Sequence, residues 1–312
     1  MAPEALAAVN GDFYVFDGPR VRGLGLEIRD GCLQQPPNDR SAFAVSDQGK
    51  PYIARFGLRA GLLTPGGADL VIAGFGRSPR AHELILYDAC TAVRGDSIRA
   101  EVGYLLQALS TALVINDTVS ARVQQLRRQA WPLLLAPGQW VVAAGDRQLT
   151  DDRFAPGDTV GVYMQLQPEP EDSVEVVPYT AAIGGGPRIV RHGGVSVEYA
   201  RESFSRFFAE ERHPRTAVGH SHDGRWLYLV TVDGRQPGYS VGMTLAELAS
   251  FMNSRLADFT ESATNAYQAM NLDGGGSTTM VIDRQVVNSP SEQTGERPVA
   301  NALVLLRPTA RQ

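Results

Sequence analysis

The sequence has little cysteine, little lysine and no long apolar run. Its 312 residues include two cysteines, Cys32 and Cys90, and one lysine, Lys50. So few cysteines exclude a disulfide scaffold. Two alternatives stay open: a single bridge between the two cysteines, or two buried thiols. The longest apolar runs fall far short of the ~18 to 20 residues that a membrane-spanning helix needs. The sequence therefore predicts no membrane span.

Basic residues are outnumbered by acidic ones and form no run. There are 29 Lys and Arg against 34 Asp and Glu, which gives a formal net charge of -5. This balance disfavours binding to nucleic acid through bulk electrostatics. With 43% hydrophobic and 20% charged residues, the composition is that of a globular protein with ample material for a core.

The first residues carry no signal peptide that the sequence reveals, because they lack a basic segment followed by an adequate apolar one. The residues at 9–13 are expected to end a strand. Such an abrupt start predicts that upstream residues have been removed or that the start codon lies too late. The N-terminus therefore predicts no localisation.

Glycine and proline are abundant, at 32 and 19 residues, and favour many turns and short strands over a helical bundle. Strands are expected at Ala68–Phe75, Glu83–Tyr87 and Gly161–Leu166, and a helix at Ser120–Arg128. The acidic, proline-rich segment at 167–172 is expected to be a solvated connector between two parts of the chain.

The pattern after residue 175 predicts a strand, a helix and a strand. Trp226–Val232 is an apolar run typical of a buried strand, and Ala269–Leu272 is expected to be a second one. Between them, Thr244 and Glu247 form a capping box that opens a helix ending by about Asp258. Such a crossover almost always joins parallel strands. We therefore expect Asp233 and Asp273, which follow the two strands, to lie at one sheet edge, ~5 Å apart for neighbouring strands or ~10 Å with one strand between them.

Two runs of three glycines, at 184–186 and 274–276, could bring backbone N–H groups close to an anion such as phosphate. The more ordinary interpretation is two tight turns. The second run has an acid before it and hydroxyls after it, at the expected ligand edge. It matches neither the Walker pattern, because no lysine follows, nor the dinucleotide fingerprint.

His220 and His222 could place two imidazoles on one face of a strand, which is a spacing found in metal sites. No other histidine offers an obvious third ligand. The ordinary alternative is a pair of polar residues leading into the turn at Asp223 and Gly224. A Ser-His-Asp hydrolase is not indicated, because the sequence has no Gly-x-Ser-x-Gly elbow.

Seven segments together resemble the phosphodiester glycosidase family, and they occur in the same order as in that family. Each segment alone is a weak signal. They are VNGDF (9–13), IGGGPRIV (183–190), HPRTAVGH (213–220), VDGR (232–235), MNLDGGGSTTMV (270–281), VVNSPS (286–291) and GERPVANAL (295–303). The resemblance implies an α+β fold: a mixed β-sheet catalytic domain with packed helices at 1–54 and 175–312, and a β-rich inserted region at 55–174. It also implies an extracellular or cell-envelope location.

The family reaction is hydrolysis of a sugar-1-phosphodiester at the glycosidic bond, with no cofactor. The resemblance supplies a residue set, to which we assign roles as hypotheses. Asp273 is the first choice for the catalytic carboxylate, with Asp233 and Glu296 in reserve. The remaining set is assigned to substrate binding: Arg215, Arg235, Arg297, Gly185, Gly186, Gly274, Gly275, Gly276, Ser277 and Thr278 to the phosphate, and Asn10, Asp12 and Asn288 to the sugar or to orientation.

Two alternatives come from other classes of protein. One is a non-catalytic binder of phosphorylated cell-surface glycan, in which the arginines and glycines serve recognition alone. The Asp-Gly-Gly-Gly-Ser-Thr segment argues against it, because a pure binder gains nothing from a buried carboxylate near phosphate. The other is a metal phosphodiesterase that cuts the P–O bond, for which the sequence offers no convergent metal ligands.

Overall fold

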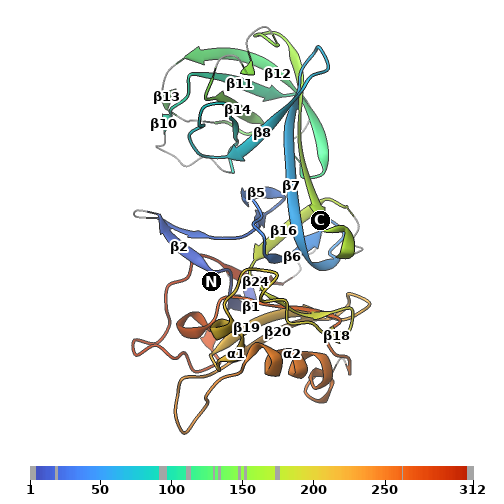
Figure 1. Cartoon of the computed structure of the whole chain (residues 1–312), viewed down its shortest axis with the longest axis vertical. Helices are drawn as coiled ribbons and strands as arrows, with labels where there is room; N and C mark the ends of the chain where they lie inside the picture. Colours follow the sequence, from blue (N-terminus) through green and yellow to red (C-terminus); the bar gives the residue numbers. More distant parts are fainter. Residues whose placement is uncertain are drawn as a thin grey trace. The chain divides into compact units, whose positions relative to one another are not determined.

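A computed structural model describes residues 5–17, 20–90, 97–109, 114–128, 131–132, 135–146, 149–150, 153–172, 176–261 and 263–307. The chain divides into two compact units (Figure 1). Unit 1 combines Met1–Leu26, Pro37–Phe56 and Ala182–Gln312, and unit 2 combines Glu27–Pro36 and Gly57–Ala181. Strands β7 (Pro51–Leu63) and β16 (Tyr179–Gly184) each run from one unit into the other.

The protein is mostly β, with 47% strand and 9% helix, and its described residues contain two α-helices, α1 (Arg206–Glu210) and α2 (Leu245–Ser254). The predicted α+β class with packed helices is therefore wrong. The expected helix at Ser120–Arg128 belongs to strand β12 (Asp117–Arg128), in which Val119, Ala121 and Val123 are buried and the residues between them exposed. That period of two is the pattern of a strand with one buried face. Neither α-helix is long and apolar enough to cross a membrane.

Unit 2 is built on a seven-stranded barrel. Its strands pair in the order β15, β12, β11, β14, β9, β8, β7, and β15 also pairs with β7, which closes the barrel. The further bounds are β8 (Asp69–Phe75), β9 (Leu84–Tyr87), β11 (Val102–Ala108), β14 (Gln139–Ala144) and β15 (Thr159–Pro168). Strands β8, β9 and β15 confirm the three strands expected in this region. Unit 2 also contains the two-stranded pair β10 (Ser97–Ile98) and β13 (Trp131–Pro132).

A disulfide bond joins Cys32 to Cys90 in unit 2, with the two Cα atoms 5.8 Å apart. Cys32 begins β5 (Cys32–Gln35), which pairs antiparallel with β4 (Glu27–Arg29). Cys90 follows β9. Of the two possibilities that the sequence left open, the bridge is the one observed.

The central sheet of unit 1 has five strands in the order β18, β17, β21, β19, β20. Their bounds are β17 (Arg188–Arg191), β18 (Gly194–Val195), β19 (Arg215–His220), β20 (Leu227–Val232) and β21 (Gln268–Asn271). Strand β19 is antiparallel to both β20 and β21, so those two are parallel with β19 between them. The predicted crossover is thus confirmed. The capping box of Thr244 and Glu247 at the start of α2 is also present.

Each face of this sheet is covered. Leu248 and Met252 of α2 are fully buried in one cluster with Ala217 of β19 and Ala269 of β21. Figure 1 shows α1 and α2 along this side of β19 and β20. Because side chains alternate along a strand, the neighbouring residues point to the other face. There Val218, Met270 and Leu272 pack with Val9, Phe43, Ile53 and Ile183.

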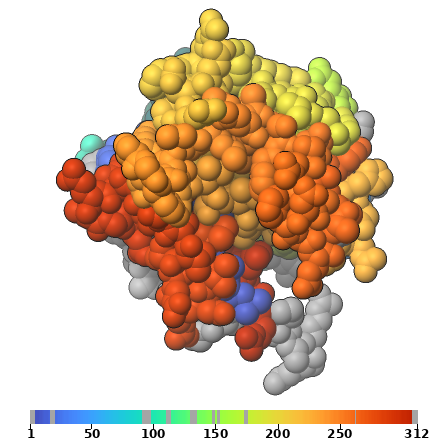
Figure 2. Space-filling view, turned by 90° about the horizontal axis from the view of Figure 1, so that it is seen from below, coloured from blue at the N-terminus to red at the C-terminus, as the bar shows by residue number. Residues whose placement is uncertain are grey.

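The second sheet of unit 1 has four strands, β23 (Gln285–Val286), β22 (Met280–Ile282), β1 (Ala5–Asn10) and β24 (Ala302–Leu306), in that order. Strand β1 therefore lies between two strands from the far end of the described chain. A hairpin, β2 (Tyr14–Asp17) and β3 (Arg20–Gly23), and strand β6 (Ser41–Ser46) complete the unit. Figure 2 shows early residues, in blue, at the surface among late residues, in red.

Candidate active site

Asp273 lies two residues after the last residue of strand β21, at the end predicted to carry the site. Its backbone N–H donates to Gly11 O at 2.9 Å, and its own carbonyl oxygen accepts from Asn10 Nδ2 at 2.6 Å. In the side chain, Oδ1 accepts from the Gly274 N–H at 2.9 Å. Burial raises the pKa of Asp273, and the hydrogen bond from the Gly274 N–H together with the charge of Arg297 offsets part of that rise. Asp273 is thus a fixed and desolvated carboxylate.

A cavity of about 490 Å³ opens beside this carboxylate, wholly within unit 1. Its lining includes Arg297, which the sequence analysis assigns to the phosphate, and Arg40, which it does not assign to the site. The guanidinium carbon of Arg40 lies 4.1 Å from the centre of the Phe204 ring. The other lining residues are Phe13, Tyr14, Leu24, Ser203, Ser205 and Phe208. One carboxylate, two arginines and an aromatic wall therefore meet in one cavity.

Arg297 is held at the cavity by an ion pair with Glu292. The Glu292 carboxylate lies directly against Gly276, where any side chain would collide with it. Gly275 has a φ of 63° and lies under Arg235, so that a Cβ there would be 3.1 Å from Arg235 Nη1. The second glycine run thus lets two charged side chains approach the backbone beside Asp273.

The first glycine run, in contrast, packs inside the protein. A Cβ at Gly185 would lie 2.7 Å from Met270 Cε and 2.9 Å from Asn271 O. The Gly186 N–H donates to Asn271 O at 2.8 Å. Gly184 similarly lies against Gly25, where a Cβ would meet Gly25 Cα at 2.7 Å. These contacts favour close packing, and the predicted phosphate contact of Gly185 and Gly186 stays a prediction.

Asn10 and Asp12 are both buried, on either side of Gly11, whose carbonyl oxygen accepts from the Asp273 N–H. Asn10 Oδ1 accepts from Thr216 Oγ1 at 2.6 Å and from the Thr279 N–H at 3.1 Å, so its side chain is fully used in positioning. Asp12 Oδ2 accepts from the Gly25 N–H at 2.6 Å, while Oδ1 is buried without a partner in the described structure. Burial raises the pKa of Asp12 to about 6.

Asp233, the first reserve carboxylate, is tied to the loop that contains Asn288. Its Oδ1 accepts from Asn288 Nδ2 at 3.0 Å and from the Ser289 N–H at 2.9 Å, and Oδ2 accepts from Tyr239 Oη at 3.0 Å. Asn288 in turn donates to Thr278 O at 3.1 Å. The predicted residues Asp233, Asn288 and Thr278 are therefore brought together, although none of them lines the cavity.

Arg215 is 1% exposed and uses its donors on backbone carbonyls. Nε donates to Met243 O at 2.9 Å, and Nη2 donates to Phe208 O at 2.6 Å and to Glu211 O at 2.9 Å. Burial, with a smaller effect from the charge of Arg235, lowers the pKa of Arg215 to about 10. These contacts suit an anchor for α1 more than a ligand of phosphate.

Comparison with known proteins decides the family. The family model described as phosphodiester glycosidase matches residues 110–306. The chain belongs to the phosphodiester glycosidase family. A mouse relative, N-acetylglucosamine-1-phosphodiester alpha-N-acetylglucosaminidase, is 29% identical over 127 residues, which are 38% of this chain and 22% of the relative. The chain thus aligns with about a fifth of that curated protein.

Two solved structures share the fold of this chain. A hypothetical protein from Synechocystis gives a TM-score of 0.64 at 22% identity, covering 97% of this chain and 52% of the other. A Burkholderia pseudomallei protein that is named as exported gives 0.62 at 23% identity, covering 97% and 66%. At these identities the likeness concerns the fold alone.

Sequence reasoning about this family member missed Arg40 and the rings of Phe13, Phe204 and Phe208. No local motif surrounds Arg40, and only the fold brings it to Phe204. Glu296, the second reserve carboxylate, is exposed and does not line the cavity.

The two histidines weighed as metal ligands lie in different surroundings. His220 is buried, with Nδ1 2.9 Å from Ser221 O, while His222 is exposed beside the Tyr267 ring. Among the described residues, no group of three or more His, Cys, Asp or Glu side chains could hold a metal ion.

Proposed function

We propose that this phosphodiester glycosidase hydrolyses the glycosidic bond of a sugar-1-phosphodiester, with a sugar similar to N-acetylglucosamine, to free sugar and a phosphomonoester. The observation that carries the proposal is the cavity of unit 1 that contains Asp273, Arg40 and Arg297 together. The activity in the mouse relative's name supports the choice of sugar.

The division of labour follows from the leaving group. A phosphate is a good leaving group without protonation, so its growing negative charge needs stabilisation more than it needs a general acid. Arg40 and Arg297 supply that stabilisation, because their positively charged guanidinium groups bind phosphate oxygens in a bidentate manner. Arg215 anchors α1 and Arg235 lies over Gly275, as their contacts indicate.

Asp273 acts at the anomeric carbon, as the nucleophile or as the base that activates water. In either case the C1–O bond breaks, the phosphate keeps the bridging oxygen, and an oxygen of water ends on the sugar. Asn10 positions Asp273 through its backbone. The rings of Phe13, Phe204 and Phe208 offer an apolar wall to the substrate.

Hydrolysis of an N-acetylglucosamine-1-phosphodiester in oxygen-18 water tests this proposal. We expect the label in the free sugar and none in the phosphomonoester. Label in the phosphate would refute cleavage at carbon. Tight binding of the substrate with no turnover, by a chain whose folding is verified, would favour the non-catalytic binder of phosphorylated glycan.

An exported or cell-envelope location is part of the proposal. The Cys32–Cys90 disulfide supports it, because disulfides persist in oxidising compartments. Alkylation of protein taken from its own cells, before and after reduction, tests this point. We expect both cysteines to be modified after reduction only, whereas modification before reduction would contradict the assignment.

A further inference from the structure

A second cavity of unit 1, of about 410 Å³, lies at the opposite end of strand β21 from Asp273. Tyr267 precedes β21 and lines this cavity, whereas Asp273 follows β21. At ~3.3 Å per residue the two positions are roughly 20 Å apart, so one monosaccharide cannot occupy both cavities. The other lining residues are Gly193, Ser221, His222, Asp223, Asn253, Thr264, Asn265 and Ala266.

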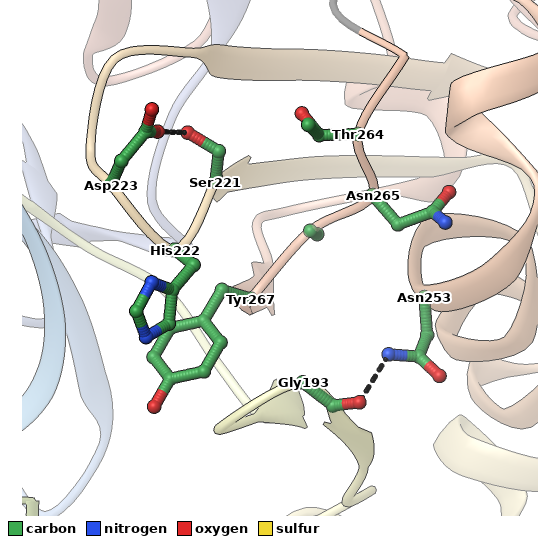
Figure 3. Close-up of a pocket in the computed structure, with 9 residues that line it drawn as sticks. Gly193, Ser221, His222, Asp223, Asn253, Thr264, Asn265 and Tyr267 are labelled. Atoms are coloured by element: carbon green, nitrogen blue, oxygen red, sulfur yellow. Dashed lines mark hydrogen bonds between the residues drawn. The ribbon is translucent and has the colours of Figure 1, made fainter.

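We propose that this cavity is a separate binding site for a neutral saccharide. The aromatic part of the site is Tyr267 with His222, whose rings meet edge to face with centres 4.5 Å apart (Figure 3). His192 contacts the same ring, with centres 5.8 Å apart, and its Nδ1 lies 3.3 Å from Tyr267 Oη. Two imidazoles thus fix the orientation of one amphipathic ring, which can pack on the C–H face of a sugar.

Two asparagine side chains supply complementary polar groups. Asn253 Nδ2 donates to Gly193 O at 2.8 Å, which leaves Oδ1 as an acceptor (Figure 3). Asn265 Oδ1 accepts from the Ala257 N–H at 3.0 Å, which leaves Nδ2 as a donor. A sugar hydroxyl both donates and accepts, so this oriented pair matches the edge of a polyol.

The backbone around the cavity is held in place by hydrogen bonds between separate elements. The Tyr267 N–H donates to His220 O at 2.8 Å, the Ala266 N–H to Met252 O at 2.9 Å and the Gly193 N–H to Tyr267 O at 2.8 Å. The site is therefore pre-organised, which lowers the entropic cost of binding.

Charge decides against other ligand classes. The described residues that line this cavity include no Lys or Arg, so an anionic ligand would have no cation among them to pair with. Asp223 is the one acidic side chain in the lining, and it accepts from Ser221 Oγ at 2.5 Å and from the Arg225 N–H at 3.1 Å within its own turn. A purely apolar ligand would leave the two asparagine amides without partners.

The test measures binding of the methyl glycosides of glucose, galactose, mannose and N-acetylglucosamine by saturation-transfer NMR and calorimetry. We expect at least one of them to bind with a dissociation constant in the millimolar range. Asn253→Ala should weaken that binding about tenfold, the usual effect of one hydrogen bond to a neutral group. His222→Ala should weaken it as well, because the Tyr267 ring loses the imidazole that orients it. Phe259→Ala, which removes an exposed ring outside the lining, is the matched control and should bind like the parent.

His222 is exposed and Asn253 lies on α2, where alanine favours the helix, so both variants are expected to fold. Both should hydrolyse a small sugar-1-phosphodiester at the parent rate, and the binding assay does not depend on that activity. The proposal fails if none of the four glycosides binds, or if binding survives unchanged in both variants.

Discussion

The side-chain amide of Asn10 donates to the main-chain oxygen of Asp273 at 2.6 Å, across a sequence separation of 263 positions. The same side chain accepts from Thr216 and Thr279. One buried amide therefore joins β1, β19 and the loop after β21, and it fixes the backbone from which the proposed catalytic carboxylate projects.

Asn10→Ala should lower kcat by roughly tenfold or more while KM changes little, because Asn10 orients Asp273 and does not line the cavity. It should also reduce the free energy of unfolding by about 1 to 3 kcal/mol, since the Thr216 hydroxyl and Thr279 amide lose their acceptor. Steady-state kinetics and urea unfolding measure the two effects. An unchanged kcat in the folded variant would remove Asn10 from the positioning role.

Asp273→Asn should abolish turnover and leave folding and substrate binding largely intact, because the amide keeps the shape of the side chain and loses its charge. Calorimetric binding and a hydrolysis assay separate the two. Glu296→Gln is the control, since Glu296 is exposed and does not line the cavity. A kcat near the parent value in Asp273→Asn would exclude this carboxylate from catalysis.

Arg40→Lys and Arg297→Lys should each lower kcat/KM by tens to hundreds of fold, roughly 1.4 to 2.7 kcal/mol, because lysine keeps the charge and loses the bidentate geometry. The loss should shrink for substrates whose leaving group has a lower pKa. Arg225→Lys, at an exposed position, is the matched control. A loss that grows with such substrates would assign these arginines to the sugar.

Asp12 predicts how stability depends on pH. Burial raises its pKa from 3.8 to about 6 in the folded protein, so between these values the folded state holds a proton that the unfolded state has lost. The contribution of Asp12 to the free energy of unfolding should therefore be largest below this range and fall by roughly 2 to 3 kcal/mol as the pH rises through it. Asp12→Asn should flatten that dependence in urea unfolding from pH 3 to 7. An equal slope in the variant would assign the effect to other carboxyl groups.

Hydrolysis should survive EDTA, because the described residues offer no cluster of metal ligands around Asp273. Activity measured before and after dialysis against the chelator checks this. A complete loss that added metal reverses would return attention to His220 and His222, and His220→Ala would then be the variant to assay.

The parts of the fold that the sequence predicted are those encoded by neighbouring residues. The capping box of Thr244 and Glu247 and the apolar face that follows it predict α2, and the short apolar runs on either side predict two parallel strands. Asp273 could therefore be assigned to a sheet edge. The helix expected at Ser120–Arg128 failed because the exposed residues of a barrel strand include good helix formers such as Gln124, Gln125 and Arg127.

Arg40 shows why the rest of the site was missed. It reaches the cavity because Phe13 and Phe204 stack with its guanidinium group, and neither ring is near it in sequence. A lone arginine without a local motif carries no signal of this kind. Arg215 is the converse case, since its place in a family segment led to its assignment to the phosphate. In the fold, its side chain donates to the carbonyls of Phe208, Glu211 and Met243.

The place of β1 between β22 and β24 has a consequence for the order of events during synthesis. At roughly 5 to 20 residues per second, β1 leaves the ribosome on the order of half a minute before either strand that pairs with it. Both of its edges then stay without partners while the barrel of unit 2 is being made. The contact between Asn10 and Asp273 cannot form in that interval, so the nascent chain acquires its proposed catalytic geometry only after residue 273 has been translated.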